Sequence, residues 1–202
     1  MALVVAVFFI IGLTKVVSDD PEIALVIGEP YEAMRKRSSA AIGPAIPGYA
    51  WFAVPKSDAR LRFNDPQYGF LTPMARFFTV TFDDELIDGV RMSPQVEPLL
   101  LDDALNVVLD LQEQWRKAGW TPTRKDFPPI ADTPDWRTQL RNKRKNGKTY
   151  WHAGDQYQAM LIIGRFHDVK RPDEERYLIS LQLATPWVKP LSAHTKFLDH
   201  EY

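Results

Sequence analysis

The chain of 202 residues contains no cysteine. This absence excludes disulfide bonds, thiol catalysis, cysteine metal ligands and the cysteine-linked lipid of bacterial lipoproteins. An excess of one charge is also missing, because 25 lysines and arginines stand against 26 aspartates and glutamates. The net charge of −1 creates no overall field that would attract nucleic acid or strongly acidic partners. The composition is therefore that of an ordinary globular protein without a redox or nucleic-acid signature.

Sequence motifs for catalysis and for metal or nucleotide binding are also missing. There is no His-Glu-x-x-His, no Gly-x-Ser-x-Gly and no dinucleotide glycine fingerprint. Residues 146–149 imitate the end of a phosphate-binding loop, but the glycine required five positions before Gly147 is absent, so we interpret Asn146-Gly147 as a turn. His152 and Asp155 could form an acid–base dyad in an envelope hydrolase, which remains an alternative function. We expect no cofactor and no metal, and we favour a protein that is not an enzyme.

The feature that the sequence does have is an apolar N-terminus. Residues 2–13 form an unbroken apolar run, and two further apolar residues, Val16 and Val17, follow Thr14 and Lys15. A helix that continues to Val17 is just long enough to cross a bilayer, with the Lys15 ammonium reaching the interface. We predict that residues 1–18 form a hydrophobic anchor or signal segment. A single-pass membrane anchor is favoured over a cleaved export signal and over a buried helix of a soluble fold.

The remainder of the chain divides into a short connecting part and a large domain. Residues 19–48 are predicted to be membrane-proximal, with a short helix over 21–38 that Pro30 interrupts. A linker over 40–48 follows, because this segment is rich in small residues, proline and glycine. Residues 49–202 are predicted to form one α+β globular domain.

Short strands and one long helix make up the predicted domain. The helix spans about 98–118, because leucines, a valine and a tryptophan recur at intervals of three and four. Gly119 is expected to end this helix, and Trp120 is expected to fold back on its last turn. A second, shorter helix is predicted over 135–144. Strands are predicted at 50–54, 59–63, 76–82, 89–92, 158–166 and 176–184.

These elements predict an α+β fold in which an antiparallel sheet packs against the long helix. The last two strands are expected to form an antiparallel hairpin, because the second one alternates apolar and polar residues. About five strands are expected in the sheet. The chain lacks the regular alternation of strands and helices that a doubly wound nucleotide-binding sheet requires.

A dense basic stretch is the first candidate for a binding surface. Cationic and aromatic side chains lie close together between residues 137 and 151. A plain solvated surface is the ordinary interpretation of such a stretch. As a functional site it is our candidate docking surface for an acidic protein partner, and nucleic acid is not expected. The acidic turn at 83–88 is the second candidate. The predicted partner-binding residues are Arg137, Arg141, Arg144, Lys145, Lys148, Tyr150 and Trp151.

The order of elements in the second half of the chain resembles that of a known protein family. The long helix ends in Ala118-Gly119-Trp120, and a proline-rich loop, a strand beginning near Trp151 and a hairpin follow. In pattern, residues 95–188 are similar to the immunity proteins of type VI secretion effectors. The resemblance implies a non-enzyme that binds and blocks a toxin. It also implies a location at the bacterial inner membrane, with residues 2–17 as the tether and the globular domain in the periplasm. An accessory subunit of a bacterial membrane complex is a further alternative.

Overall fold

The structure is a computed structural model that describes residues 20–188. The predicted hydrophobic segment 1–18 therefore lies outside the described residues. None of the helices between residues 20 and 188 has the length and apolar character needed to span a bilayer. In chain order the elements are β1 (Glu22–Leu25), α1 (Tyr31–Arg37), β2 (Trp51–Ala53), β3 (Arg60–Phe63), β4 (Phe70–Leu71), β5 (Phe78–Asp83), β6 (Leu86–Met92), α2 (Leu101–Lys117), β7 (Thr121–Pro122), α3 (Pro134–Arg141), β8 (Asn146–Ala153), β9 (Tyr157–Phe166) and β10 (Arg176–Ala184).

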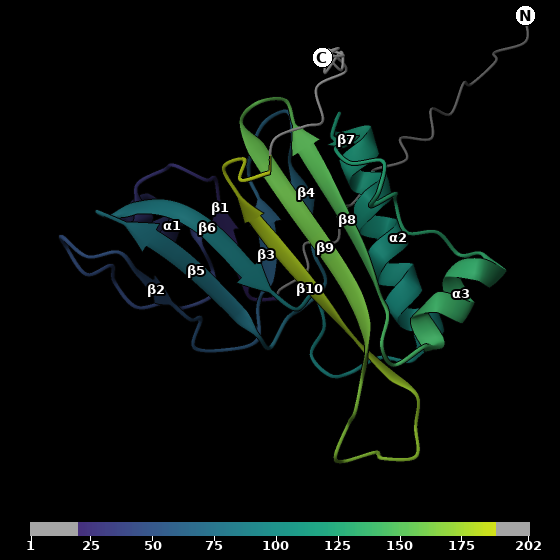
Figure 1. Cartoon of the computed structure of the whole chain (residues 1–202). Helices are drawn as coiled ribbons and strands as arrows, with labels where there is room; N and C mark the ends of the chain where they lie inside the picture. Colours follow the sequence, from purple (N-terminus) through teal and green to yellow (C-terminus); the bar gives the residue numbers. More distant parts are fainter. Residues whose placement is uncertain (1–19, 189–202) are drawn as a thin grey trace, which may run out of the picture.

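A seven-stranded antiparallel sheet forms the centre of the molecule, in the order β2-β5-β6-β10-β9-β8-β7 (Figure 1). The predicted hairpin is confirmed, because β9 and β10 pair along their whole shared length. Side chains on β10 alternate as the sequence predicts. Tyr177, Ile179 and Leu181 are buried on the inner face, while Leu178 and Ser180 are partly exposed on the outer face. The α+β class with an antiparallel sheet is thus confirmed.

Helix α2 covers part of the inner face and matches the predicted long helix. Its apolar stripe from Leu101 to Trp115 is buried, as the three-to-four spacing predicts. Gly119 has a φ of +87°, the left-handed conformation that closes a helix. The Trp120 N–H donates to the Trp115 carbonyl at 2.9 Å, and the Trp120 side chain is buried. The helix therefore ends as predicted.

The N-terminal part of the described chain corrects the prediction of a helix over 21–38. Glu22–Leu25 forms β1, which pairs in parallel with β3, and only Tyr31–Arg37 is helical. A short apolar run such as 23–27 fits a fully buried strand as well as a helix, and here pairing with β3 decides between them. The strands β1, β3 and β4 form a separate sheet, seen behind the large one in Figure 1.

The segment 40–48 was expected to be a linker, but its first part packs on the domain. Ala40 and Ile42 are buried, and the Tyr31 hydroxyl donates to the Gly43 carbonyl at 2.9 Å. The Tyr31 ring meets Phe82 of β5 edge-on, with centroids 5.0 Å apart. Residues from Glu22 onward therefore share one core with the rest of the described chain.

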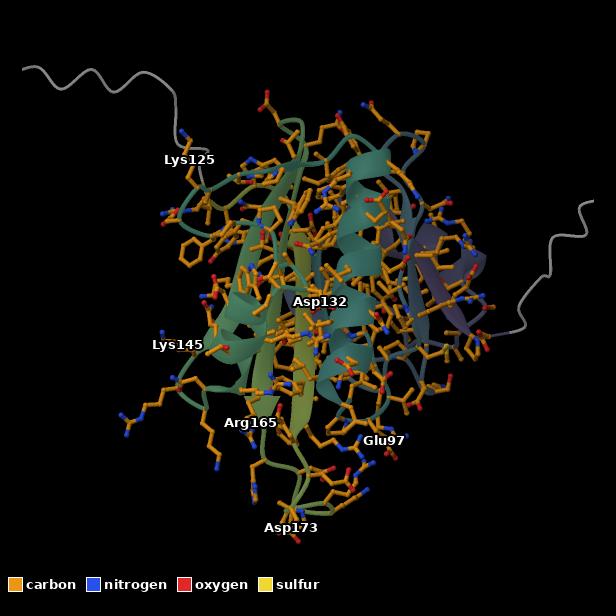
Figure 2. The ribbon with its side chains drawn as sticks, turned by 90° about the vertical axis from the view of Figure 1, so that its right-hand side faces the viewer. Glu97, Lys125, Asp132, Lys145, Arg165 and Asp173 are labelled. Atoms are coloured by element: carbon orange, nitrogen blue, oxygen red, sulfur yellow. The ribbon has the colours of Figure 1, made fainter. Side chains whose placement is uncertain are left out.

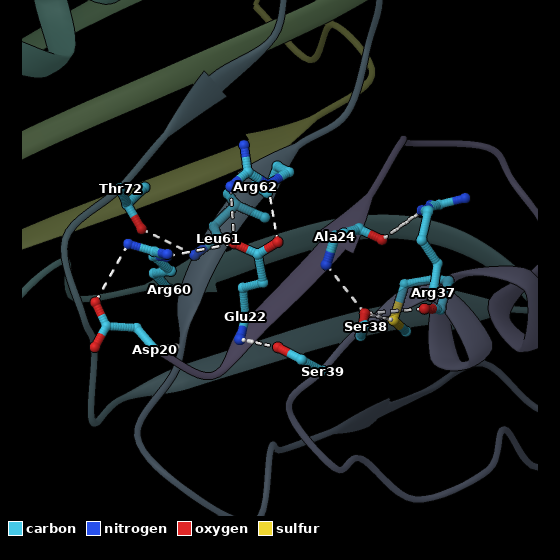
Figure 3. A network of polar contacts seen from close by, with 11 residues as sticks. Asp20, Glu22, Ala24, Arg37, Ser38, Ser39, Arg60, Leu61, Arg62 and Thr72 are labelled. Carbon is cyan, nitrogen blue, oxygen red and sulfur yellow. Dashed lines mark hydrogen bonds and ion pairs between the residues drawn. The ribbon is translucent and has the colours of Figure 1, made fainter. Parts of the chain in front are cut away.

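An ion-pair network fixes β1 on β3 (Figure 3). The Glu22 carboxylate accepts from Arg62 Nε at 2.9 Å and from Arg60 Nε at 3.3 Å. Asp20 also pairs with Arg60, at 3.3 Å. The hydrogen bond from Arg62 is the main cause that lowers the pKa of Glu22, with Arg60 adding to it against the opposing effect of burial. The two cationic side chains therefore stabilise the charged carboxylate in the folded state.

Replacing Glu22 with glutamine is expected to cost about 1 kcal/mol of unfolding free energy at pH 7. The carboxylate has a lower pKa folded than unfolded, so its stabilisation is complete above the usual value of 4.5. That stabilisation disappears as the pH falls through the folded-state pKa. Urea denaturation at pH 7 and at pH 3 measures the unfolding free energy of the unmodified protein and of Glu22→Gln at each pH. A difference between the two proteins that is larger at pH 3 than at pH 7 would contradict the assignment.

An aromatic cluster joins the two sheets and α2 in the core. Trp115 of α2 meets Trp151 of β8 at 5.7 Å and Phe70 of β4 at 5.6 Å between ring centroids. Phe63 of β3 meets Tyr157 of β9 edge-on at 5.0 Å. Such pairs add to the free energy gained from burying large rings. This cluster therefore packs the inner face of the large sheet against α2 and the small sheet.

Glutamine side chains bond backbone N–H and carbonyl groups in loops and along parts of strands that lack a neighbouring strand. The Gln112 amide accepts from the Ile130 N–H at 2.9 Å and donates to the Ile130 carbonyl at 2.8 Å. Gln114 makes the same pair of bonds with Leu71. Gln95 bonds the backbone of β10, and Gln158 bonds Val188. A side-chain amide carries one acceptor and a donor group, so it can replace a neighbouring strand.

Candidate functional site

The predicted basic surface carries less free charge in the structure than in the sequence. Arg137 pairs with Asp102 at 2.6 Å and also with Asp132, and these contacts raise its pKa above the ordinary value. Arg141 lies 3.5 Å from a carboxylate oxygen of Glu175. These three carboxylates neutralise the two arginines locally. The two arginines therefore connect α3 to its surroundings.

The aromatic members of the predicted surface are also partly withdrawn. Trp151 is fully buried at 0% exposure, so it belongs to the core and cannot contact a partner. Tyr150 is half-buried and packs against Phe127, with ring centroids 5.4 Å apart. The Lys148 ammonium lies 5.7 Å from the centroid of the same Phe127 ring. These contacts account for the mixture of basic and aromatic residues without a ligand.

Two cations of the predicted surface, Arg144 and Lys145, are exposed. Neither forms an ion pair within the described part of the chain. Figure 2 shows Lys145 and Arg165 on the same side of the molecule, with Arg165 nearer to the loop that carries Asp173. A polar hollow close by is lined by Lys143, Arg165 and Glu174, among others. The basic surface is thus a small exposed region with compensating carboxylates.

The acidic turn connects β5 to β6 and has an unusual backbone. Asp84 and Glu85 both have positive φ angles, 45° and 67°. A two-residue hairpin loop requires this conformation at both positions, for which glycine and asparagine are the favoured residues. Asp83, Asp84, Glu85 and Asp88 are exposed, and none of them forms an ion pair with another residue between 20 and 188. The turn is therefore a strained and uncompensated acidic feature.

Replacing Glu85 with glycine is expected to stabilise the protein by about 0.5–1 kcal/mol, because glycine adopts positive φ without a steric penalty. Thermal unfolding of the two proteins measures the change. The control variant Glu85→Ala removes the carboxylate but keeps a Cβ. If Glu85→Ala stabilises the protein as much as Glu85→Gly, charge rather than backbone strain accounts for the effect.

A hollow on the outer face of the large sheet lies beside this turn. It has a volume of about 360 Å³, and Phe52 and Phe77 line it together with Asp88, Gly89 and Arg91. The register between β5 and β6 shifts between Thr81 and Phe82, which leaves Asp88 as the extra residue of a β-bulge. Bulges often redirect a side chain at a functional site. Here the bulge places Asp88 beside Gly89 in the lining of the hollow.

Gly89 lines this hollow at a tightly packed point of the sheet. A Cβ at position 89 would lie 3.1 Å from the Leu183 carbonyl oxygen and 3.1 Å from the Thr81 hydroxyl. A second hollow of about 290 Å³ adjoins the first, because Phe77 lines both; Leu178 and Ser180 are among its other residues. The outer face over β5, β6 and β10 is therefore recessed along a line that passes Phe77.

The edge strand β2 borders the first hollow and exposes large apolar side chains. Trp51 is 56% exposed and Phe52 is 48% exposed, and their rings stack with centroids 5.4 Å apart. β2 pairs with β5 on one side and ends the strand order of the large sheet on the other. The exposed apolar side chains around it are Ile46, Tyr49, Trp51, Phe52 and Val54. We call this set, with Asp88 and Phe77, the β2 corner.

Sequence reasoning predicted β2 as a strand but missed its exposure. The adjacent aromatics Trp51 and Phe52 were a usable signal, because neighbouring residues of a strand point to opposite faces and one ring must leave the core. The two aromatic residues alone do not predict which elements cover each face of the sheet. The acidic turn was predicted as a surface, and the structure places it beside the β2 corner.

The alternative catalytic pair does not form a hydrogen-bonded dyad. His152 lies on β8 and is 6% exposed, and no hydrogen bond joins it to Asp155 within the described residues. Burial lowers the pKa of His152, and the Val188 backbone and the Asp155 carboxylate oppose that shift. No group of three or more metal-ligating residues occurs between residues 20 and 188.

Comparisons with known proteins assign no identity to this geometry. The chain matches no protein-family model, no curated protein and no solved structure. A function is therefore inferred from the surface of the protein, in which the β2 corner combines exposed aromatics and the Asp88 carboxylate at an edge strand.

Proposed function

We propose that the protein is a binding protein that neutralises a partner protein, as an immunity protein neutralises a toxin. Residues 2–17 tether it to the bacterial inner membrane, and the domain faces the periplasm. The observation that carries the proposal is the β2 corner, where two large aromatic side chains are about half exposed at an unpaired strand edge.

Exposed aromatics at a sheet edge favour a macromolecular partner for two reasons. Large apolar side chains that gather on a surface mark sites of protein contact, and tryptophan is enriched among the residues that dominate binding energy. A free edge also presents backbone donors and acceptors that can pair with another chain. A protein that kept such an edge without a partner would risk aggregation. Recognition of another protein accounts for both features.

The experiment is a pull-down of the tagged full-length protein from the envelope of its native cells, followed by mass spectrometry. We expect one stoichiometric protein partner, captured by the unmodified protein. The variant Trp51→Ser/Phe52→Ser should lose this partner. The matched control Phe166→Ser should retain it, because Phe166 is 40% exposed at the far end of β9.

The neutralising activity has its own readout. Expression of the captured partner alone should arrest growth, and co-expression of the tethered protein should restore it. If no partner is captured, or if the partner is harmless alone, the proposal is wrong. A set of integral membrane proteins captured together would instead support the accessory-subunit alternative.

A further inference from the structure

We infer that the β2 corner accepts an extended basic segment of the partner, which adds to the sheet next to β2 and places a lysine or arginine side chain in the hollow beside Asp88. The inference rests on the proposed function and specifies the chemistry of the partner. Three observations carry it: the free edge, the lining of the hollow and the charge around it.

The backbone of β2 is prepared for a further strand. In an antiparallel ladder, alternate residues direct their N–H and C=O groups toward one neighbour and the rest direct them away. β2 pairs with β5 through Trp51, Phe52 and Ala53. Within residues 20–188, no backbone hydrogen bond outside the β2–β5 ladder involves these three residues. The chain just beyond them is already paired, because Pro55 bridges Ile42 and the Lys56 N–H donates to the Ala41 carbonyl at 2.8 Å, so only Trp51–Ala53 offer unpaired groups. The outward-facing groups of β2 are therefore available to an added strand, and the short edge requires side-chain anchors as well.

The lining of the hollow suits a cationic side chain. Phe52 and Phe77 are about half exposed, and both line the hollow that the Asp88 carboxylate also lines. A lysine or arginine beside an aromatic face gains a cation–π attraction, and a carboxylate nearby strengthens its binding. The β-bulge brings Asp88 to this lining, and the hollow of about 360 Å³ has the space that a long side chain requires.

The charge around the β2 corner favours a basic partner segment. The four exposed carboxylates of the acidic turn lie where β5 ends and β6 begins. None of them forms an ion pair with another residue between 20 and 188. Arg91 also lines the hollow, but one guanidinium does not balance four carboxylates. The excess negative charge attracts cations and speeds their encounter with the edge.

The test selects peptides on the full-length protein in non-ionic detergent micelles. A library of random eight-residue peptides is panned against the protein and depleted on the variant Phe52→Ser/Asp88→Lys. We expect peptides that alternate basic and apolar residues. A synthetic copy of the best peptide should bind about tenfold more weakly to Asp88→Lys, which corresponds to one lost charge contact. A proline in the centre of the peptide should remove binding, because strand addition requires its N–H groups.

The matched control is Asp173→Lys, which makes the same charge change on an exposed residue of the β9–β10 loop (Figure 2). Its peptide affinity should equal that of the unmodified protein. The inference would be overturned if the panning enriched acidic peptides, peptides without a pattern, or no peptides. It would also be overturned if Asp88→Lys and Asp173→Lys lost equal peptide affinity. If the native partner is captured and Asp88→Lys still binds it, the proposed function survives and this inference fails. A homodimer that Phe52→Ser abolishes would also overturn it.

Discussion

Trp151→Ala is expected to lower the free energy of unfolding by about 3–5 kcal/mol, which is the usual cost of truncating a large buried aromatic side chain. Trp151 has no exposed surface, and its ring packs against Trp115 at 5.7 Å between centroids. The Arg116 guanidinium lies 5.4 Å from the centre of the Trp151 ring and covers it. The change therefore opens a cavity between α2 and β8, which urea denaturation of the full-length protein measures.

Trp151→Phe serves as the matched control, because it keeps a ring in the same place and removes the indole N–H. That N–H has no hydrogen-bond partner in the described part of the chain. The expected loss is about 1–2 kcal/mol, from the smaller ring volume alone. If Trp151→Ala leaves stability unchanged and abolishes partner capture instead, Trp151 belongs to the binding surface and the assignment to the core is wrong.

Gln112→Met is expected to cost about 2–4 kcal/mol, because it leaves the Ile130 N–H and carbonyl unpaired in a buried position. Gln112 and Ile130 are both fully or almost fully buried, at 0% and 1% exposure. Methionine preserves the length and approximate volume of glutamine, so the change isolates the two hydrogen bonds of 2.9 and 2.8 Å. Urea denaturation again supplies the free energy.

Gln156→Met is the control for this prediction, since Gln156 is exposed in the turn between β8 and β9. Its effect should stay within about 0.5 kcal/mol. Equal losses in the two variants would show that the Gln112 amide contributes nothing specific. Amide hydrogen exchange gives an independent readout, because the Ile130 N–H should lose its protection in Gln112→Met and retain it in Gln156→Met.

The parts of the fold that the sequence predicts correctly are those with a strong local pattern. Helix α2 repeats its apolar residues over four turns and ends at Gly119, so neither a neighbour nor a ligand is needed to recognise it. In the β9–β10 hairpin, β10 alternates clearly between apolar and polar residues, and the loop is rich in turn-forming residues. In both cases the information lies within a few residues of the chain, where periodicity is informative.

The elements that sequence reasoning missed depend on distant partners. β1 is a strand because β3, almost forty residues later, pairs with it. β8 begins at Asn146-Gly147, which reads as a turn, but Gly147 pairs with Ile163. A Cβ at Gly147 would lie 3.2 Å from the Trp136 ring, so packing requires glycine at this point of the strand.

The two candidate surfaces differ from the sequence predictions for the same reason. The basic run was evident from composition, but the carboxylates that neutralise it come from elsewhere: Asp102 is 35 residues from Arg137. The β2 corner has no local signature beyond two adjacent aromatics. Its exposure follows from the position of β2 at the end of the strand order, and no short stretch of sequence contains that position.

Site-specific photocrosslinking in native cells tests the central claim most directly. A photoreactive amino acid is placed at position 52, 145 or 166 of the full-length protein, and adducts are identified by mass spectrometry. The account predicts one protein adduct from position 52 and none from position 166. An adduct from position 145 alone would place the partner on the basic surface. That result, or the absence of an adduct at all three positions, would contradict a partner-binding role for the β2 corner.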